Sequence, residues 1–143
     1  MTQQAILGPV FAMVGLTFVV WVYMYVRRIH FLTSNDIRPD QVQTPQAMEA
    51  ITPPDVARPS DNLKNLFEIP VLFYALALLL YATQQVDAVY VAAAWVFVAL
   101  RVAHSAVHCT INIVMLRFWI YALSTLAVWF IAGRATLRYL GAA

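Results

Sequence analysis

Long apolar stretches alternate with short polar connections along the chain. Residues 5–26 carry no charged side chain, and the stretch ends at Arg27 and Arg28. A hydrocarbon core about 30 Å thick is crossed by about 20 helical residues, so this stretch can span a membrane. Three further apolar stretches follow, and we expect membrane helices at about residues 5–28, 63–84, 88–112 and 113–138. Short connections make successive helices antiparallel, which predicts an all-α, four-helix membrane bundle in a single domain over residues 1–143.

The segment from residue 30 to 62 has a different character from the apolar stretches. Few large apolar side chains and mixed charges accompany its five prolines, which are Pro39, Pro45, Pro53, Pro54 and Pro59. Proline-rich segments of this kind are typical of irregular connections. We expect an aqueous loop with one short helix around residues 46–50.

The composition excludes an ordinary soluble enzyme. Of the 143 residues, 62% are hydrophobic and 11% charged, whereas soluble domains carry about 25% charged residues. The net charge of +2 gives no argument for nucleic-acid binding, and no such partner is expected. A single cysteine, Cys109, excludes an internal disulfide. No lysine or arginine precedes the first apolar stretch, so a cleaved signal peptide is not expected.

The basic residues near the predicted helix ends are distributed unequally, and cytoplasmic ends carry the excess of lysine and arginine. One side would carry Arg27, Arg28, Arg38, Arg58, Lys64 and Arg117. The other side would carry only Arg134 and Arg138. We therefore expect the long loop to be cytoplasmic and both termini to lie outside.

Polar side chains inside the apolar stretches are the candidate functional residues, because an ionisable group there costs at least about 2.5–3.5 kcal/mol on insertion scales. At 100° per residue, one arc of about 100° on the third helix holds Arg101, His104, Ser105, His108 and Asn112. In the second helix Asn65 and Glu68 are three residues apart and would share a face. The polar groups of the four helices should converge on the cytoplasmic leaflet.

Several interpretations of these groups remain open. Arg27 and Lys64 could mark helix ends by placing their charges at the interface, and Arg101 with Glu68 could be a structural ion pair. A metal site is not expected, because the paired histidines of the third helix have no third ligand beyond Glu68. A rim of cations backed by amide, carboxylate and imidazole groups suits a small anion. A cation beside a bound thiol would also favour the reactive thiolate.

Three motifs carry a resemblance to a known family. The stretches 65–73 (NLFEIPVLF), 101–108 (RVAHSAVH) and 117–121 (RFWIY) resemble the MAPEG family, the membrane-associated proteins in eicosanoid and glutathione metabolism. The sequence of the first stretch most resembles the bacterial branch of the family. This resemblance implies that the protein is located in a bacterial inner membrane.

The resemblance implies a homotrimer that binds glutathione between neighbouring subunits near the cytoplasmic side. Arg117 matches the arginine taken to stabilise the thiolate, and is thus the expected catalytic residue. The expected glutathione-binding residues are Arg27, Lys64, Asn65, Glu68, Arg101, His104, His108 and Tyr121. His108 stands where a tyrosine is usual, and Phe118 replaces a serine proposed to assist the thiol.

Two functions are compatible with these residues. The first is a membrane-bound, glutathione-dependent transferase or peroxidase, which acts on lipophilic electrophiles or lipid hydroperoxides through an activated thiolate. The alternative is a non-catalytic protein of the same fold, either a lipid-binding protein or a scaffold. In both cases the chain contacts membrane lipid, but only the first requires a lipophilic small-molecule substrate.

Overall fold

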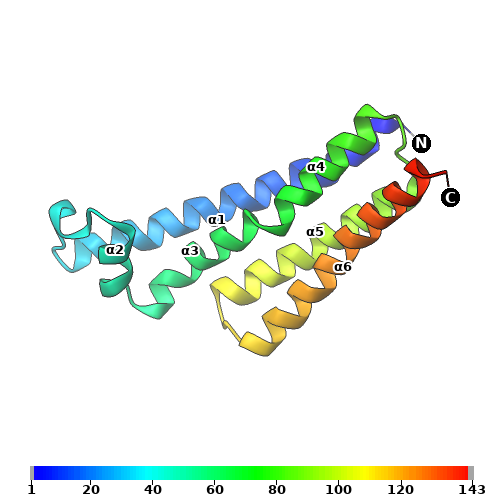
Figure 1. Ribbon diagram of the computed structural model, residues 1–143. Helices are drawn as coiled ribbons and strands as arrows, with labels where there is room; N and C mark the ends of the chain where they lie inside the picture. The colour runs from blue at the N-terminus through cyan, green and yellow to red at the C-terminus, as the bar shows by residue number, and fades with distance from the viewer. Residues whose placement is uncertain (1, 142–143) are drawn as a thin grey trace.

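A computed structural model describes residues 2–141, which form a helical bundle (Figure 1). Its elements are η1 (Gln3–Ile6), α1 (Leu7–Ser34), η2 (Pro39–Val42), α2 (Pro45–Ile51), α3 (Pro54–Leu66), α4 (Ile69–Ala82), α5 (Ala88–Cys109) and α6 (Val114–Tyr139). Four helical segments are long and apolar enough to cross a membrane within this range: Gln3–Ser34, Pro54–Ala82, Ala88–Cys109 and Val114–Tyr139. The predicted all-α membrane bundle is therefore confirmed.

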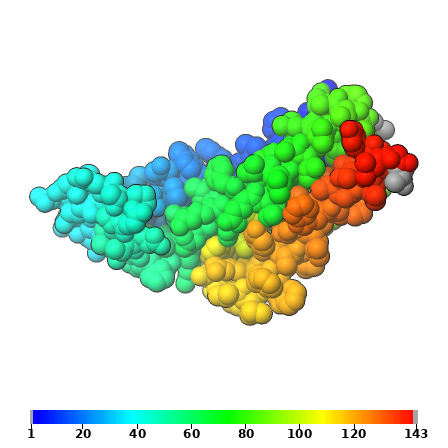
Figure 2. Space-filling model, in the orientation of Figure 1, coloured from blue at the N-terminus to red at the C-terminus, as the bar shows by residue number. Residues whose placement is uncertain are grey.

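The outer surface of the bundle is apolar, as a lipid-facing surface must be. Large side chains lie exposed along its length, with Phe18 at 62% and Trp129 at 56% of their surface accessible. The core contains Met13 of α1, Phe73 of α4 and Phe97 of α5, and the two phenylalanine rings lie 4.7 Å apart. The long helices lie side by side, while α2 projects with the ends of α1 and α3 at one end (Figures 1 and 2).

Helix α3 begins inside the segment for which the sequence predicts an irregular loop, so that prediction is wrong for residues 54–62. Pro54 occupies the first helical position, where its missing N–H is not needed. Pro59 lies inside α3 and cannot donate to the carbonyl of Asp55. Arg27 of α1 donates to that carbonyl oxygen over 3.3 Å and also pairs with the Asp55 carboxylate at 2.7 Å. A side chain of another helix thus replaces the hydrogen bond that Pro59 removes.

The second membrane segment is broken at Phe67 and Glu68, although the sequence predicts one continuous helix over residues 63–84. Helix α3 ends at Leu66, and α4 begins at Ile69. Glu68 has φ −101° and ψ −105°, outside the helical region. Pro70 follows in the first turn of α4 and has no N–H for the carbonyl of Leu66. Asn65 and Glu68 therefore lie on opposite sides of a break and not on one helical face.

Helix α5 ends three residues earlier than predicted, so the connection between α5 and α6 is longer. Helix α5 ends at Cys109 and α6 begins at Val114, where the sequence predicts helices over residues 88–112 and 113–138. Asn112 has φ +50°, a left-handed conformation that asparagine tolerates better than most residues. The chain reverses there, so Asn112 does not lie on the polar face of α5, where the helical spacing predicts it.

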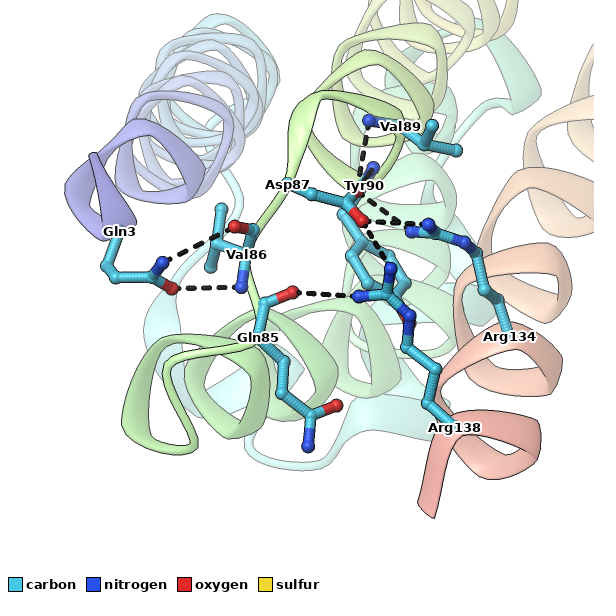
Figure 3. Close-up of polar contacts among 8 residues, drawn as sticks. All are labelled: Gln3, Gln85, Val86, Asp87, Val89, Tyr90, Arg134 and Arg138. Carbon is cyan, nitrogen blue, oxygen red and sulfur yellow. Dashed lines mark hydrogen bonds and ion pairs between the residues drawn. The ribbon is translucent and has the colours of Figure 1, made fainter. Parts of the chain in front are cut away.

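At the opposite end of the bundle, an acid and two arginines join the α4–α5 turn to α6 (Figure 3). Asp87 accepts hydrogen bonds from the N–H groups of Val89 and Tyr90 and so caps α5. Its carboxylate binds Arg134 through two bonds of 2.8 and 2.7 Å, and lies 2.8 Å from Arg138. The guanidinium of Arg134 also lies 4.3 Å from the ring centroid of Tyr90. We call these four residues, Asp87, Tyr90, Arg134 and Arg138, the Asp87 cluster.

In the Asp87 cluster the negative charge of Asp87 is paired with the positive charges of Arg134 and Arg138. The hydrogen bond from Arg134 holds the pKa of Asp87 well below its usual range. The amide of Gln3 fastens η1 to the same turn, since its Oε1 accepts from the N–H of Val86 at 2.9 Å. The cluster and Gln3 therefore tie both outer helices, α1 and α6, to the α4–α5 turn.

Candidate functional site

The inner face of α5 carries four buried polar side chains at the end nearest the long loop. Arg101 is fully buried, and His104, Ser105 and His108 are 2–3% exposed. They lie on one face because their spacing follows the helical repeat. The structure thus brings together the α5 residues that the sequence singles out, with the exception of Asn112.

Arg101 connects α5 to the break in the second membrane segment. Its Nη2 donates to the main-chain carbonyl of Asn65 over 2.6 Å. The guanidinium lies 5.1 Å from the ring centroid of Tyr121 on α6. Its Nε and Nη1 atoms are buried and have no hydrogen-bond partner among residues 2–141. Arg101 therefore fixes the end of α3 and retains two donors for another acceptor.

The two histidines of α5 connect the same face to α3 and α6. His104 Nδ1 lies 3.0 Å from the carbonyl oxygen of Arg117, and it must donate because a carbonyl oxygen only accepts. Its Nε2 is buried without a partner in the described part of the chain. His108 Nδ1 lies 3.5 Å from the side-chain amide of Asn65. The rings are perpendicular, with centroids 5.5 Å apart.

Tyr121 and Glu68 complete the cluster on its exposed side. The ring of Tyr121 lies 5.6 Å from that of His104, and its hydroxyl donates to Glu68 over 3.4 Å. Within residues 2–141 no ion pair includes Glu68, so the expected pair with Arg101 is not formed. The break at Glu68 explains this difference, because Arg101 binds a main-chain carbonyl while the carboxylate of Glu68 lies exposed.

The other three predicted site residues have partners of their own. Arg117 donates through Nη1 to Asn112 over 2.7 Å and reaches the cluster through its main-chain carbonyl. Lys64 pairs with Asp61 at 3.1 Å. Arg27, as described, pairs with Asp55. In the described part of the chain, Arg27 and Lys64 make no hydrogen bond or ion pair with the buried cluster.

A second polar contact between α3 and α5 involves Asn62, a residue that the sequence does not single out. Ser105 donates to the side-chain oxygen of Asn62 over 3.3 Å, and the Asn62 amide lies 3.5 Å from the sulfur of Cys109. Asn62 is fully buried. It precedes Asn65 by three residues and therefore shares its face of the helix. This spacing was available in the sequence, but the predicted loop ended at Asn62.

Four apolar helices that enclose arginine, histidine and asparagine side chains at one end define an integral membrane protein with a polar site inside the bundle. The chain belongs to the MAPEG family, whose family model matches residues 6–137 and so includes every residue of the cluster. The family is associated with the use of glutathione. No curated protein and no solved structure matches the chain significantly.

Proposed function

We propose that the protein is a membrane-bound, glutathione-dependent transferase or peroxidase that acts on lipophilic electrophiles or lipid hydroperoxides. The observation that carries this proposal is that the guanidinium of Arg101 is buried and incompletely hydrogen-bonded. A buried charged group is costly unless it is paired, and two of its nitrogen atoms have no partner in residues 2–141. A carboxylate is the ordinary partner of a guanidinium, and glutathione carries two. The buried donors therefore fit this co-substrate.

The other residues would bind the remaining parts of the tripeptide. Asn65 offers an amide to the peptide groups, His104 has a free Nε2, and the exposed carboxylate of Glu68 suits the amino group. His108 and Tyr121 hold Asn65 and Glu68 through the contacts described above. Arg27 and Lys64 would join the site from the rim if ligand binding released them from Asp55 and Asp61.

Arg117 would supply the chemical activation. A permanently charged guanidinium near a thiol lowers the thiol pKa and stabilises the thiolate. Its bond to Asn112 orients the group in the first turn of α6. The thiolate sulfur would then bond to the electrophilic carbon of the substrate, while the leaving group departs with its electron pair. The apolar outer faces of α1 and α6 allow such a substrate to arrive through the bilayer.

The proposal includes a homotrimer. Glu68 is exposed, although it lies within the span Pro54–Ala82, and beside it Phe67 is 65% exposed. A carboxylate in contact with lipid is unfavourable, so a second copy of the chain that covers this face would stabilise it. Native mass spectrometry in a mild detergent should give three subunits, and a persistent monomer would contradict the assembly.

Calorimetry with glutathione on the purified protein tests the function. Wild-type protein should bind glutathione and give an ultraviolet thiolate signal at neutral pH. Arg117→Ala should lose that signal, and each unit of lost pKa shift corresponds to about 1.4 kcal/mol. Most of the binding should be retained, because Lys64, Asn65 and Glu68 remain. Arg38→Ala is the matched control, since within residues 2–141 Arg38 forms an ion pair with Asp40 alone, in the exposed loop. Binding without any thiolate signal in the wild type would refute the catalytic role of Arg117.

A second candidate function is a non-catalytic lipid-binding or scaffold protein of the same fold. The observation in its favour is that Arg27, Lys64 and Arg117 all bind partners in their own chain. The cluster would then hold helices together and bind no thiol. Failure of the wild-type protein to bind glutathione would favour this candidate.

A further inference from the structure

A cavity of about 600 Å³ lies beside the buried α5 cluster and shares only Lys64 with the predicted site residues. It lies at the end of the bundle where α2 projects, an end that Figure 1 shows. Its walls come from the end of α1, from the η2–α2 segment and from α3. Leu32, Val42, Met48 and Val56 give it an apolar lining. Its volume is in the range of small-molecule sites, about 300–1,000 Å³.

The charged groups that line this cavity are not all paired. Lys64 is neutralised by Asp61, which also lines it. Arg28 donates only to the hydroxyl of Ser60, over 3.3 Å, and forms no ion pair within residues 2–141. Glu49 likewise forms no ion pair in that range. The cavity therefore presents one guanidinium and one carboxylate that lack ionic partners.

The position of Arg28 indicates where the cavity lies relative to a bilayer. The uncharged stretch over residues 5–26 ends directly before Arg27 and Arg28. Arg27 is bound to Asp55, so Arg28 is the residue of this pair that is available at the level of the lipid headgroups. Phosphate is the abundant anion at that level, and guanidinium groups bind it well.

We propose that this cavity binds a headgroup that carries both a phosphate and a protonated amine, with the phosphate on Arg28 and the amine on Glu49. The apolar lining accommodates the carbon atoms that join the phosphate to the amine. The headgroup of an amine-bearing phospholipid and the corresponding soluble phosphodiester share this chemistry. The proposal is independent of thiol chemistry in the α5 cluster.

Native mass spectrometry of lipid retention tests the proposal. Delipidated protein receives equal amounts of phosphatidylethanolamine and phosphatidylglycerol with identical acyl chains. The wild type should retain the ethanolamine lipid preferentially, and Arg28→Gln should reduce retention of that lipid about tenfold, as expected for the loss of a charge-assisted hydrogen bond. Glu49→Gln should abolish the preference between the lipids. Arg38→Gln is the matched control and should behave as the wild type.

A second variant tests the role of the cavity without removing a charge. A second probe distinguishes a lipid ligand from a soluble one. Met48→Trp fills the cavity while it keeps both charges, and it should also reduce retention. Binding of free glycerophosphoethanolamine that depends on Arg28 would identify a soluble ligand, whereas retention of the lipid alone would identify the membrane as the source. Equal retention of both lipids by the wild type would refute the amine contact. Unchanged binding of both probes in Arg28→Gln and Met48→Trp would overturn the proposal.

Discussion

Replacement of Asp87 by asparagine isolates the electrostatic contribution of the Asp87 cluster. The substitution is nearly isosteric, and asparagine caps a helix about as well as aspartate. The bonds from the N–H groups of Val89 and Tyr90 should therefore persist. What disappears is the negative charge that binds Arg134 and Arg138.

The magnitude follows from the geometry and from the exposure of these groups. Arg134 binds the carboxylate through two bonds, and hydrogen bonds to charged groups contribute about 1.5–3 kcal/mol. Arg138 adds a contact at 2.8 Å. The side chains are 22–31% exposed, so solvent screening reduces both contributions. We expect Asp87→Asn to lower the free energy of unfolding by about 2 kcal/mol.

The same charge gives the expected effect a definite pH dependence. The folded-state pKa of Asp87 is held below its ordinary value by Arg134. The stabilisation is therefore complete above the unfolded pKa of about 4 and declines as the pH falls below it. The difference between the wild type and Asp87→Asn should be constant near neutral pH and should shrink below about pH 4.

Denaturant titration of the detergent-solubilised protein at several pH values measures this difference. Asp40→Asn is the matched control, because the Arg38–Asp40 pair is 73% and 57% exposed and should contribute about 0–1 kcal/mol. Equal stability of Asp87→Asn and the wild type at neutral pH would refute the reasoning. A difference that grows as the pH falls would refute the assigned sign.

Three further predictions concern the candidate site and the orientation of the chain. Arg101→Lys should destabilise the protein by about 1–3 kcal/mol, because the shorter lysine side chain does not place its one nitrogen where the guanidinium donates to the carbonyl of Asn65; a melting temperature equal to that of the wild type would contradict this. Glu68→Gln should change stability by less than about 0.5 kcal/mol, since glutamine can still accept the hydrogen bond from Tyr121 and Glu68 forms no ion pair within residues 2–141, yet it should weaken glutathione binding in calorimetry. A large loss of stability there would show a structural role. A cysteine placed at Gln43 should resist membrane-impermeant thiol reagents in intact cells if the long loop is cytoplasmic, and rapid labelling would reverse the proposed orientation.

The membrane spans and the polar face of α5 could be predicted from the sequence because both depend on local patterns. Residues 5–26 are uncharged and must lie in lipid or in a core. Arg101, His104 and His108 follow the helical repeat, so their common face is fixed as soon as the helix exists. The structure places all three on that face and buries them.

The break at Glu68 and the Asp87 cluster could not be predicted in this way, because both depend on contacts between distant segments. Pro70 alone does not specify a break, since neighbouring helices often satisfy the groups that a proline frees. Here Arg101, from another helix, donates to the carbonyl of Asn65 beside the break. Arg134 similarly appears in the sequence as an isolated terminal charge, and its partner Asp87 lies 47 positions away. The start of α3 was missed for the same reason, because Arg27 compensates for Pro59.

The bond between Arg101 and the carbonyl of Asn65 has a consequence for how such a site can diverge during evolution. A main-chain oxygen is present whatever side chain occupies position 65, so Arg101 can hold the end of α3 in a variant with a different residue there. The side chain of residue 65, which faces His108, is thereby free to vary with the ligand. A substitution at position 65 can therefore change which ligand is bound without a second substitution to hold the end of α3 in place. Position 101, by contrast, should tolerate almost no exchange.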